Sequence, residues 1–180
     1  MVDMRPVPEP GKDNRSELLE LYDSSLPYVY GYLLSRSGAA HLAEELTSET
    51  FLAAADAVLR DPAPPLSTGW LVGVARHKLV DYWRRQAREE RGLRLLGETA
   101  SSDDDSDIWN VHLDAMRARA VLETLAPHHR AALTPRYLDD LPVSEVAELM
   151  DRSVLATEAL LVRARSAFRR AYSAEESSDV

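Results

Sequence analysis

The sequence predicts an all-α protein made of two small helical domains joined by a flexible acidic linker. Apolar residues recur at steps of three and four along most of the chain, and no useful run alternates between apolar and polar residues. The 180 residues, 45% of them hydrophobic, can bury one modest core or two small ones, and a long polar stretch near residue 100 favours two. The expected parts are a disordered N-terminus (1–14), the first domain (15–95), the linker (96–113), the second domain (114–172) and a disordered acidic tail (173–180).

The first domain is predicted to begin with two helices. The first runs from about Ser16 to Arg36, is bent by Pro27 and ends at Gly38. The second runs from about Ala40 to Leu59 and leaves an acidic surface opposite its apolar side. Its expected inward residues are Leu42, Leu46, either Phe51 or Leu52, and Leu59, and its expected surface residues are Glu44, Glu45, Ser48, Glu49 and Asp56.

A proline-rich loop and a long basic helix complete the first domain. The loop, 61–69, has three prolines and must be extended, and Ser67 or Thr68 can cap the helix that follows. That helix, 70–94, has an apolar side with two tryptophans, and its charged side carries Arg76, Lys78, Arg84, Arg85, Arg88 and Arg91. Such a helix is a solvated face, a surface for anionic lipid, or a surface that holds DNA phosphates and stacks on unpaired bases.

Charge is sorted along the chain, although the net charge is -9. Residues 13–59 carry two arginines against eight acids, residues 68–95 carry seven Lys or Arg against three acids, and residues 97–114 carry six acids and no Lys or Arg. Random DNA would repel such a molecule at long range. We therefore expect DNA binding only where the basic stretch docks, or when a larger partner holds it there.

The linker and the second domain follow. The linker is a plain connector, or its aspartates at 103–105 and 107 imitate nucleic-acid phosphates in a basic channel of a partner. Two helices are expected at 114–124 and 127–137, with Pro135 kinking or shortening the second. A helix capped by Pro142 or Ser144, a turn at 151–153 and a last helix from Val154 to about Tyr172 form either a helix-turn-helix or a plain helical hairpin.

Several classes of protein are disfavoured by composition. The chain has no cysteine, so it has neither a disulfide nor a Cys-ligated zinc site, which fits the cytoplasm. No apolar run approaches the roughly 18 residues of a membrane span. Its five histidines lack metal-ligand spacing, and it has no glycine-rich phosphate loop and no nucleophile beside a base. We therefore expect no enzyme, no metal, no cofactor and no small-molecule substrate.

Four segments together resemble the extracytoplasmic-function group of bacterial sigma factors. They read HLAEELTSETFLAAADAV, GWLVGVARHKLVDYWRRQ, LETLAPHHRAALTPRYLDDLPVSEVAELMDRSV and LLVRARSAFRR. The resemblance covers about 16–95 and 115–172. It implies a two-domain initiation factor. The first domain would bind core RNA polymerase and open the minus-10 promoter element, and the second would dock on the minus-35 element. Factors of this group are often held by an anti-sigma factor.

The resemblance also implies contact residues at matching positions. Polymerase contacts are implied for Glu45, Leu46, Ser48 and Glu49. Contacts to the minus-10 element are implied for Ser67, Thr68, Trp70, Arg76, His77, Lys78, Asp81, Arg84 and Arg85, where the loop captures a flipped base. Contacts to the minus-35 element are implied for Arg152, Ser153, Thr157, Arg163 and Arg165.

The chain departs from the family pattern at several of these places. Ser48 replaces a frequent glutamine, Asp151 replaces the usual turn glycine, and Glu158 and Leu160 stand where basic residues are usual. The minus-35 element is then read mainly through shape and phosphates, or the second domain has drifted toward protein contacts. Two alternatives stay open: a stand-alone helix-turn-helix regulator, and a polymerase-binding adaptor without minus-35 recognition.

Overall fold

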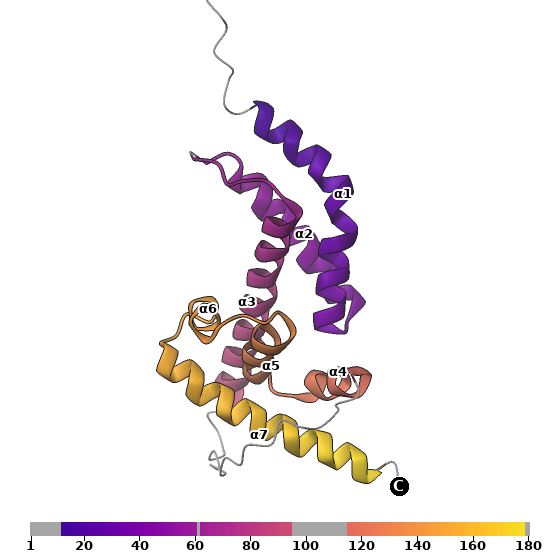
Figure 1. The fold of residues 1–180 in the computed structure, drawn as a ribbon, viewed down its shortest axis with the longest axis vertical. Coiled ribbons are helices and arrows are strands. Elements are labelled where there is room, and N and C mark those ends of the chain that lie inside the picture. The colour runs from indigo at the N-terminus through magenta and orange to yellow at the C-terminus, as the bar shows by residue number, and fades with distance from the viewer. Residues whose placement is uncertain (1–11, 61, 95–114, 179–180) are drawn as a thin grey trace, which may run out of the picture. The chain divides into compact units, whose positions relative to one another are not determined.

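The computed structural model describes residues 12–60, 62–94 and 115–178, and every regular element in these ranges is a helix (Figure 1). The predicted all-α class is therefore confirmed. The chain divides into two compact units, residues 1–78 and 79–180. The division falls inside the helix α3, Thr68–Arg94, whereas the sequence prediction ends the first domain at residue 95.

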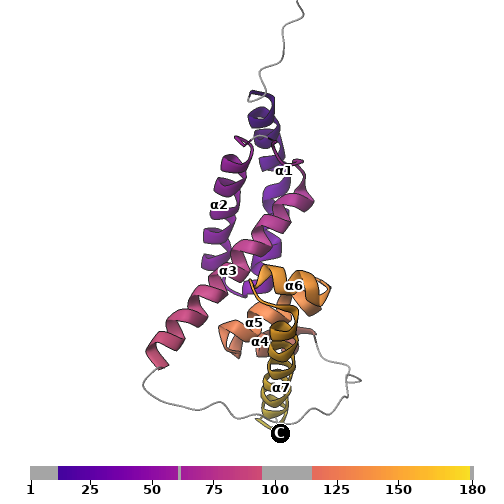
Figure 2. The same ribbon diagram turned by 90° about the vertical axis from the view of Figure 1, so that its left-hand side faces the viewer.

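Unit 1 is built on an antiparallel pair of helices, α1 (Lys12–Ser37) and α2 (Ala40–Ala57), which lie side by side in both ribbon views (Figures 1 and 2). Gly38 joins them with a φ of 72°, a left-handed conformation that glycine adopts without steric cost. As predicted, Pro27 lies inside α1. The first part of α3 completes the unit.

The core of unit 1 is made of small and branched apolar side chains. Its buried members are Val29, Leu33, Ala43, Leu46, Ala54, Val58, Leu71 and Ala75. The prediction that Leu59 points inward is wrong, because α2 ends at Ala57 and Leu59 is 57% exposed. Between the two candidates Phe51 and Leu52, the half-buried Phe51 faces inward and Leu52 is 68% exposed.

Side-chain hydroxyls fix the start of α3. The Ser67 Oγ accepts a hydrogen bond from the Trp70 backbone N–H at 3.1 Å, which satisfies an otherwise unpaired donor of the first turn. The Thr68 Oγ1 lies 2.7 Å from the Oγ of Ser25, a fully buried residue of α1. Of the two predicted capping residues, Ser67 is the cap, and Thr68 ties α3 to α1.

Unit 2 holds the rest of α3 and a cluster of shorter helices that contact α7 (Val154–Ser178) (Figure 1). They are α4 (Ala115–Thr124), α5 (Pro127–Leu133) and α6 (Val143–Leu149). After α5 the backbone widens into a π-helical turn, Thr134–Leu138, which contains Pro135. The predicted shortening at Pro135 is confirmed, whereas α7 extends six residues past the expected end at Tyr172.

A tight turn connects α6 to α7, as a helix-turn-helix requires (Figure 1). Asp151 adopts a φ of 53°, and the Arg152 N–H donates to the Ala147 carbonyl at 2.9 Å, which closes the end of α6. The Ser153 Oγ accepts from the Ala156 N–H at 3.2 Å and caps α7. Ala147 is buried, and its small side chain suits the close approach of the two helices.

Candidate functional site

The outer surface of α2 carries the acidic residues that the sequence singled out. Glu45 and Ser48 are exposed, and Glu49 is half-exposed, with its carboxylate 3.4 Å from the Lys78 Nζ of α3. Leu46 is fully buried. Its side chain therefore belongs to the core of unit 1 rather than to the exposed contact surface expected of it.

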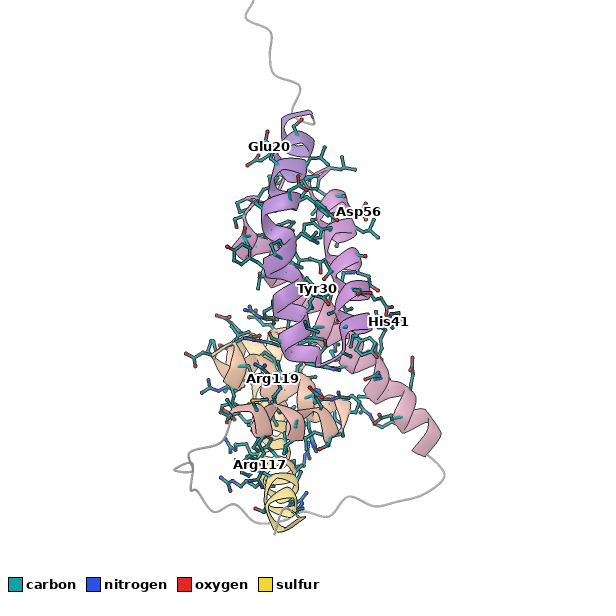
Figure 3. All side chains as sticks on the ribbon, turned by 90° about the vertical axis from the view of Figure 1, so that its right-hand side faces the viewer. Glu20, Tyr30, His41, Asp56, Arg117 and Arg119 are labelled. Carbon is teal, nitrogen blue, oxygen red and sulfur yellow. The ribbon has the colours of Figure 1, made fainter. Side chains whose placement is uncertain are left out.

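A groove of about 750 Å³ runs between α1 and α2 on the same side as Ser48. Its lining is mostly apolar and aromatic, and the Tyr22 and Phe51 rings meet edge-on at 4.6 Å. The full lining is Tyr22, Leu26, Pro27, Tyr30, Glu44, Thr47, Ser48, Phe51 and Leu52. The label of Tyr30 marks the α1 side of the groove in Figure 3. Sequence analysis placed Glu44 and Ser48 on the surface and either Phe51 or Leu52 inward, and it missed the groove, for which the surplus of apolar positions on α1 was the available signal.

The first half of α3 has few free polar groups among the residues expected to meet DNA. The hydroxyls of Ser67 and Thr68 are engaged in the cap and in the contact with α1. The His77 Nδ1 lies 3.0 Å from the Gly73 carbonyl, and the side chain as a whole is exposed. Trp70 and Arg76 are half-buried.

The second half of α3 is where exposed positive charge gathers. Arg84 donates to Asp81 at 3.1 Å and to Asp151, of the turn before α7, at 3.3 Å. Arg85 and Arg88 are exposed. The structure therefore brings the predicted residues Asp81 and Arg84 into one ion pair and leaves Arg85 facing solvent.

The helix-turn-helix presents a mixed surface. Arg152, Ser153 and Arg163 are exposed, and the Arg165 Nη1 donates to the Tyr137 hydroxyl at 3.3 Å. Thr157 is fully buried, and its hydroxyl donates to the Ser153 carbonyl at 3.0 Å, so the side chain is part of the core of unit 2 and does not reach the surface expected of it.

The exposed face at the start of α7 is apolar and acidic at positions where the family usually has basic residues. Leu155 is 76% exposed, and Glu158 and Ala159 are exposed beside it. Leu155, Ala159 and Arg163 recur every four residues and therefore share a face. Sequence analysis did not single out Leu155; its solvent exposure makes it a candidate contact residue.

Positive charge also surrounds two histidines of α5. Burial and, to a lesser extent, the positive charge of His129, Arg91, Arg152 and Arg163 together lower the pKa of His128 from 6.5 to about 4. Burial, together with Arg163 and Arg170, lowers the pKa of His129 as well. Both imidazoles are therefore neutral at pH 7, and the arginines supply the charge of this region.

Neither a metal site nor a membrane span is found in the described part of the chain. No three His, Cys, Asp or Glu side chains within residues 12–60, 62–94 and 115–178 are grouped as metal ligands. None of the helices in the same ranges is long and apolar enough to cross a bilayer.

Comparison with known proteins identifies relatives over both units. Residues 21–89 match the family sigma-70 region 2, and residues 115–168 match sigma-70 region 4. The ECF RNA polymerase sigma factor SigM of Bacillus subtilis is 30% identical over 154 residues, which are 85% of this chain and 93% of SigM. The ECF RNA polymerase sigma factor BldN of Streptomyces coelicolor is 33% identical over 153 residues, 80% of this chain and 56% of BldN. Among solved structures, the sigma factor RpoE in complex with the anti-sigma factor NepR from Bartonella quintana is 20% identical with a TM-score of 0.49, over 89% of this chain and 96% of that one.

Proposed function

This chain belongs to the extracytoplasmic-function group of RNA polymerase sigma factors in the sigma-70 family, and we propose that it directs core RNA polymerase to a small set of promoters. The observation that carries the proposal is that one chain combines an exposed basic helix, α3, with a helix-turn-helix, α6–α7. A stand-alone regulator would need only the second of these, and the similarity to SigM extends over both.

In this proposal α2 binds the polymerase. Glu45 and Ser48 are exposed on it, and a basic clamp surface on the polymerase suits their acidic surroundings. The neighbouring α1–α2 groove offers apolar surface that a partner can bury. Charged residues alone would not provide such a surface. An anti-sigma factor is also among the proposed partners, because a protein covering this groove would exclude polymerase.

The basic helix α3 and the loop before it are proposed to open the minus-10 element. Arg84 and Arg85 are proposed to hold backbone phosphates: Arg85 is exposed, and Arg84 would exchange its exposed carboxylate partners for phosphates. The half-buried Trp70 lies next to the loop. Stacking of an aromatic ring on an unpaired base contributes about 1 to 3 kcal/mol, comparable with the few kcal/mol needed to unstack it. Binding energy is then enough for opening, so this chain needs no catalytic group.

The helix-turn-helix is proposed to dock on the minus-35 element. Arg152, Arg163 and Arg165 supply phosphate contacts around the turn and along α7. The exposed Leu155 and Glu158 suit base edges in the major groove: an apolar side chain contacts the thymine methyl group, and a carboxylate accepts a hydrogen bond from the cytosine N4. The buried Thr157 side chain is not part of this surface.

The deciding experiment is run-off transcription with core bacterial polymerase, the full chain and a pool of genomic promoter fragments, followed by sequencing of the transcript starts. We expect starts that cluster behind one shared pair of minus-10 and minus-35 sequences. Polymerase binding without promoter-specific starts would favour the adaptor, which the exposed apolar face of α7 also suits. Absence of polymerase binding would refute the proposed function.

A further inference from the structure

Four arginines surround a hollow of about 270 Å³ in unit 2, which we term the arginine hollow. Three of them come from α3, and the fourth comes from the turn between α6 and α7. The lining consists of Arg84, Ala87, Arg88, Arg91, His128, Met150, Asp151 and Arg152. The hollow therefore has four cationic side chains, one carboxylate and an imidazole that is neutral at pH 7.

The arginines of α3 share one face of the helix. Arg84, Arg88 and Arg91 are four and three residues apart, the spacing that brings side chains together on a helix. Like charges at this spacing destabilise a helix. Because Arg152 adds a fourth positive charge from another segment, this arrangement costs free energy unless an anion compensates for it.

Only part of this charge is compensated within the chain. Arg84 is paired with Asp81 and Asp151. Within the described ranges no carboxylate lies within ion-pair distance of Arg88, Arg91 or Arg152. The Asp151 side chain is 86% exposed, so a stronger anion can replace it beside Arg84 without disturbing the core.

We propose that the arginine hollow binds a compact anion with two adjacent phosphate groups. Guanidinium groups match phosphate oxygens in charge and in two-point geometry, and they are more weakly hydrated than an ammonium group. The volume of about 270 Å³ falls just below the roughly 300 to 1,000 Å³ of pockets for drug-sized ligands, which suits a diphosphate. Two sources have this chemistry, a free diphosphate compound and two successive links of a nucleic-acid backbone.

Calorimetric titration of the full chain with sodium pyrophosphate, in low-salt buffer without phosphate at pH 7.5, tests this site. We expect saturable binding that Arg88→Ala and Arg152→Ala each weaken about tenfold, since each removes a charge-assisted contact. Asp151→Asn should strengthen binding up to about fivefold, since it removes the competing carboxylate. The matched control is Arg119→Ala, which removes one positive charge from an exposed residue of α4 (Figure 3) and should leave binding unchanged.

The position of the bound anion has its own readout. Because His128 lines the hollow, a bound anion should raise the pKa of its imidazole above about 4, which proton NMR of the histidine ring measures. Absence of saturable binding, or equal binding by the wild type and a folded Arg88→Ala/Arg152→Ala double variant, would overturn the proposal. Circular dichroism verifies that both chains are folded.

A competition experiment separates the two sources. Non-promoter duplex DNA that displaces pyrophosphate from the wild type supports a site for backbone phosphates. Simultaneous binding of DNA and pyrophosphate supports a site for a free diphosphate compound. The titration uses neither polymerase nor promoter DNA, so failure of pyrophosphate to bind and failure of promoter-specific transcription are separate results.

Discussion

Two aspartates adopt a left-handed backbone conformation that residues other than glycine rarely adopt. Asp140 and Asp151 both have a φ of 53°. We predict that Asp140→Ala lowers the Tm of the chain by about 4 to 8 °C, because alanine lacks the polar side chain with which aspartate tolerates this conformation. Asp140→Gly should leave the Tm unchanged, because glycine adopts a positive φ freely.

Thermal unfolding followed by circular dichroism measures both variants. The Asp140 carboxylate is fully exposed and 3.8 Å from Arg136, so its loss contributes little by itself. Equal destabilisation by glycine and alanine would mean that the carboxylate, rather than the backbone conformation, determines the stability of this turn.

His128 makes the stability of the fold depend on pH. In the unfolded chain its pKa has the ordinary value of 6.5, and in the folded chain burial lowers the pKa to about 4. Above pH 6.5 both states are neutral and the residue has no effect. Between pH 6.5 and pH 4 the unfolded state binds the extra proton, so the fold loses stability as the pH falls.

We therefore predict that the free energy of unfolding falls less between pH 7.5 and pH 5 in His128→Gln than in the wild type. Urea unfolding of both chains at the two pH values gives the comparison. The other ionisable groups are the same in both chains, so the difference between the chains reports mainly on His128 and on its interaction with His129. An identical pH dependence in the two chains would show that His128 is protonated as easily in the folded protein as in the unfolded one.

Single side chains show what the sequence could and could not predict. Ser67 was predictable as a cap, because a serine before a helical run has a local reason to be there. The burial of Thr157 was not predictable from its polarity. A threonine hydroxyl can donate to the carbonyl four residues earlier, and the side chain can then lie in a core. Thr47 and Thr50 of α2 do the same with Ala43 and Leu46. Polarity alone therefore did not distinguish surface residues from buried ones.

Whole helices were predicted better than their faces. The break at Pro135 was foreseen, because proline has no N–H for the helix and clashes with the preceding turn. The α1–α2 groove was not foreseen. Both helices carry more apolar residues than their mutual contact covers, and the periodicity of the sequence does not tell which of these residues remain exposed. Exposed apolar residues such as Leu52 and Leu155 only became candidate contacts once their burial was known.

The surface of α2 gives a prediction for polymerase binding. Glu45 is exposed, and placing a positive charge there would oppose a basic clamp. We predict that Glu45→Lys weakens binding to core polymerase at least about tenfold, measured by competition against the wild type. The control is Glu20→Lys, which makes the same change at an exposed residue of α1 (Figure 3). Unchanged binding by Glu45→Lys would move the polymerase contact away from α2.

The exposed face of α7 gives a prediction for promoter choice. If Glu158 accepts a hydrogen bond from a cytosine, Glu158→Ala should relax the preference at one position of the minus-35 element by about 1 to 3 kcal/mol. Removal of the negative charge should also raise affinity for all sequences. Transcription from a randomised minus-35 library by the holoenzyme measures both effects. Glu17→Ala of α1 is the control, and an unaltered preference in Glu158→Ala would place Glu158 away from the bases.

At the scale of the whole molecule, the net charge of -9 is compatible with DNA binding because the charges are segregated. The acids of α2 and the arginines of α3 occupy different helices, so one chain can offer an acidic surface to a protein and a basic surface to DNA. Overall negative charge also limits binding to random DNA. We therefore expect this chain to reach promoters chiefly as part of a larger complex.

The salt dependence of DNA binding tests this separation of charge. Each phosphate contact contributes about -0.7 to -0.9 to the slope of log affinity against log salt. For the full chain and a forked minus-10 DNA, we predict that Arg84→Ala/Arg85→Ala makes the slope shallower by nearly 2, because two phosphate contacts are lost. The control variant Arg119→Ala/Arg170→Ala has the same net charge but loses exposed residues of α4 and α7, and should keep the wild-type slope. If both double variants changed the slope equally, net charge rather than the position of the arginines on α3 would determine DNA binding.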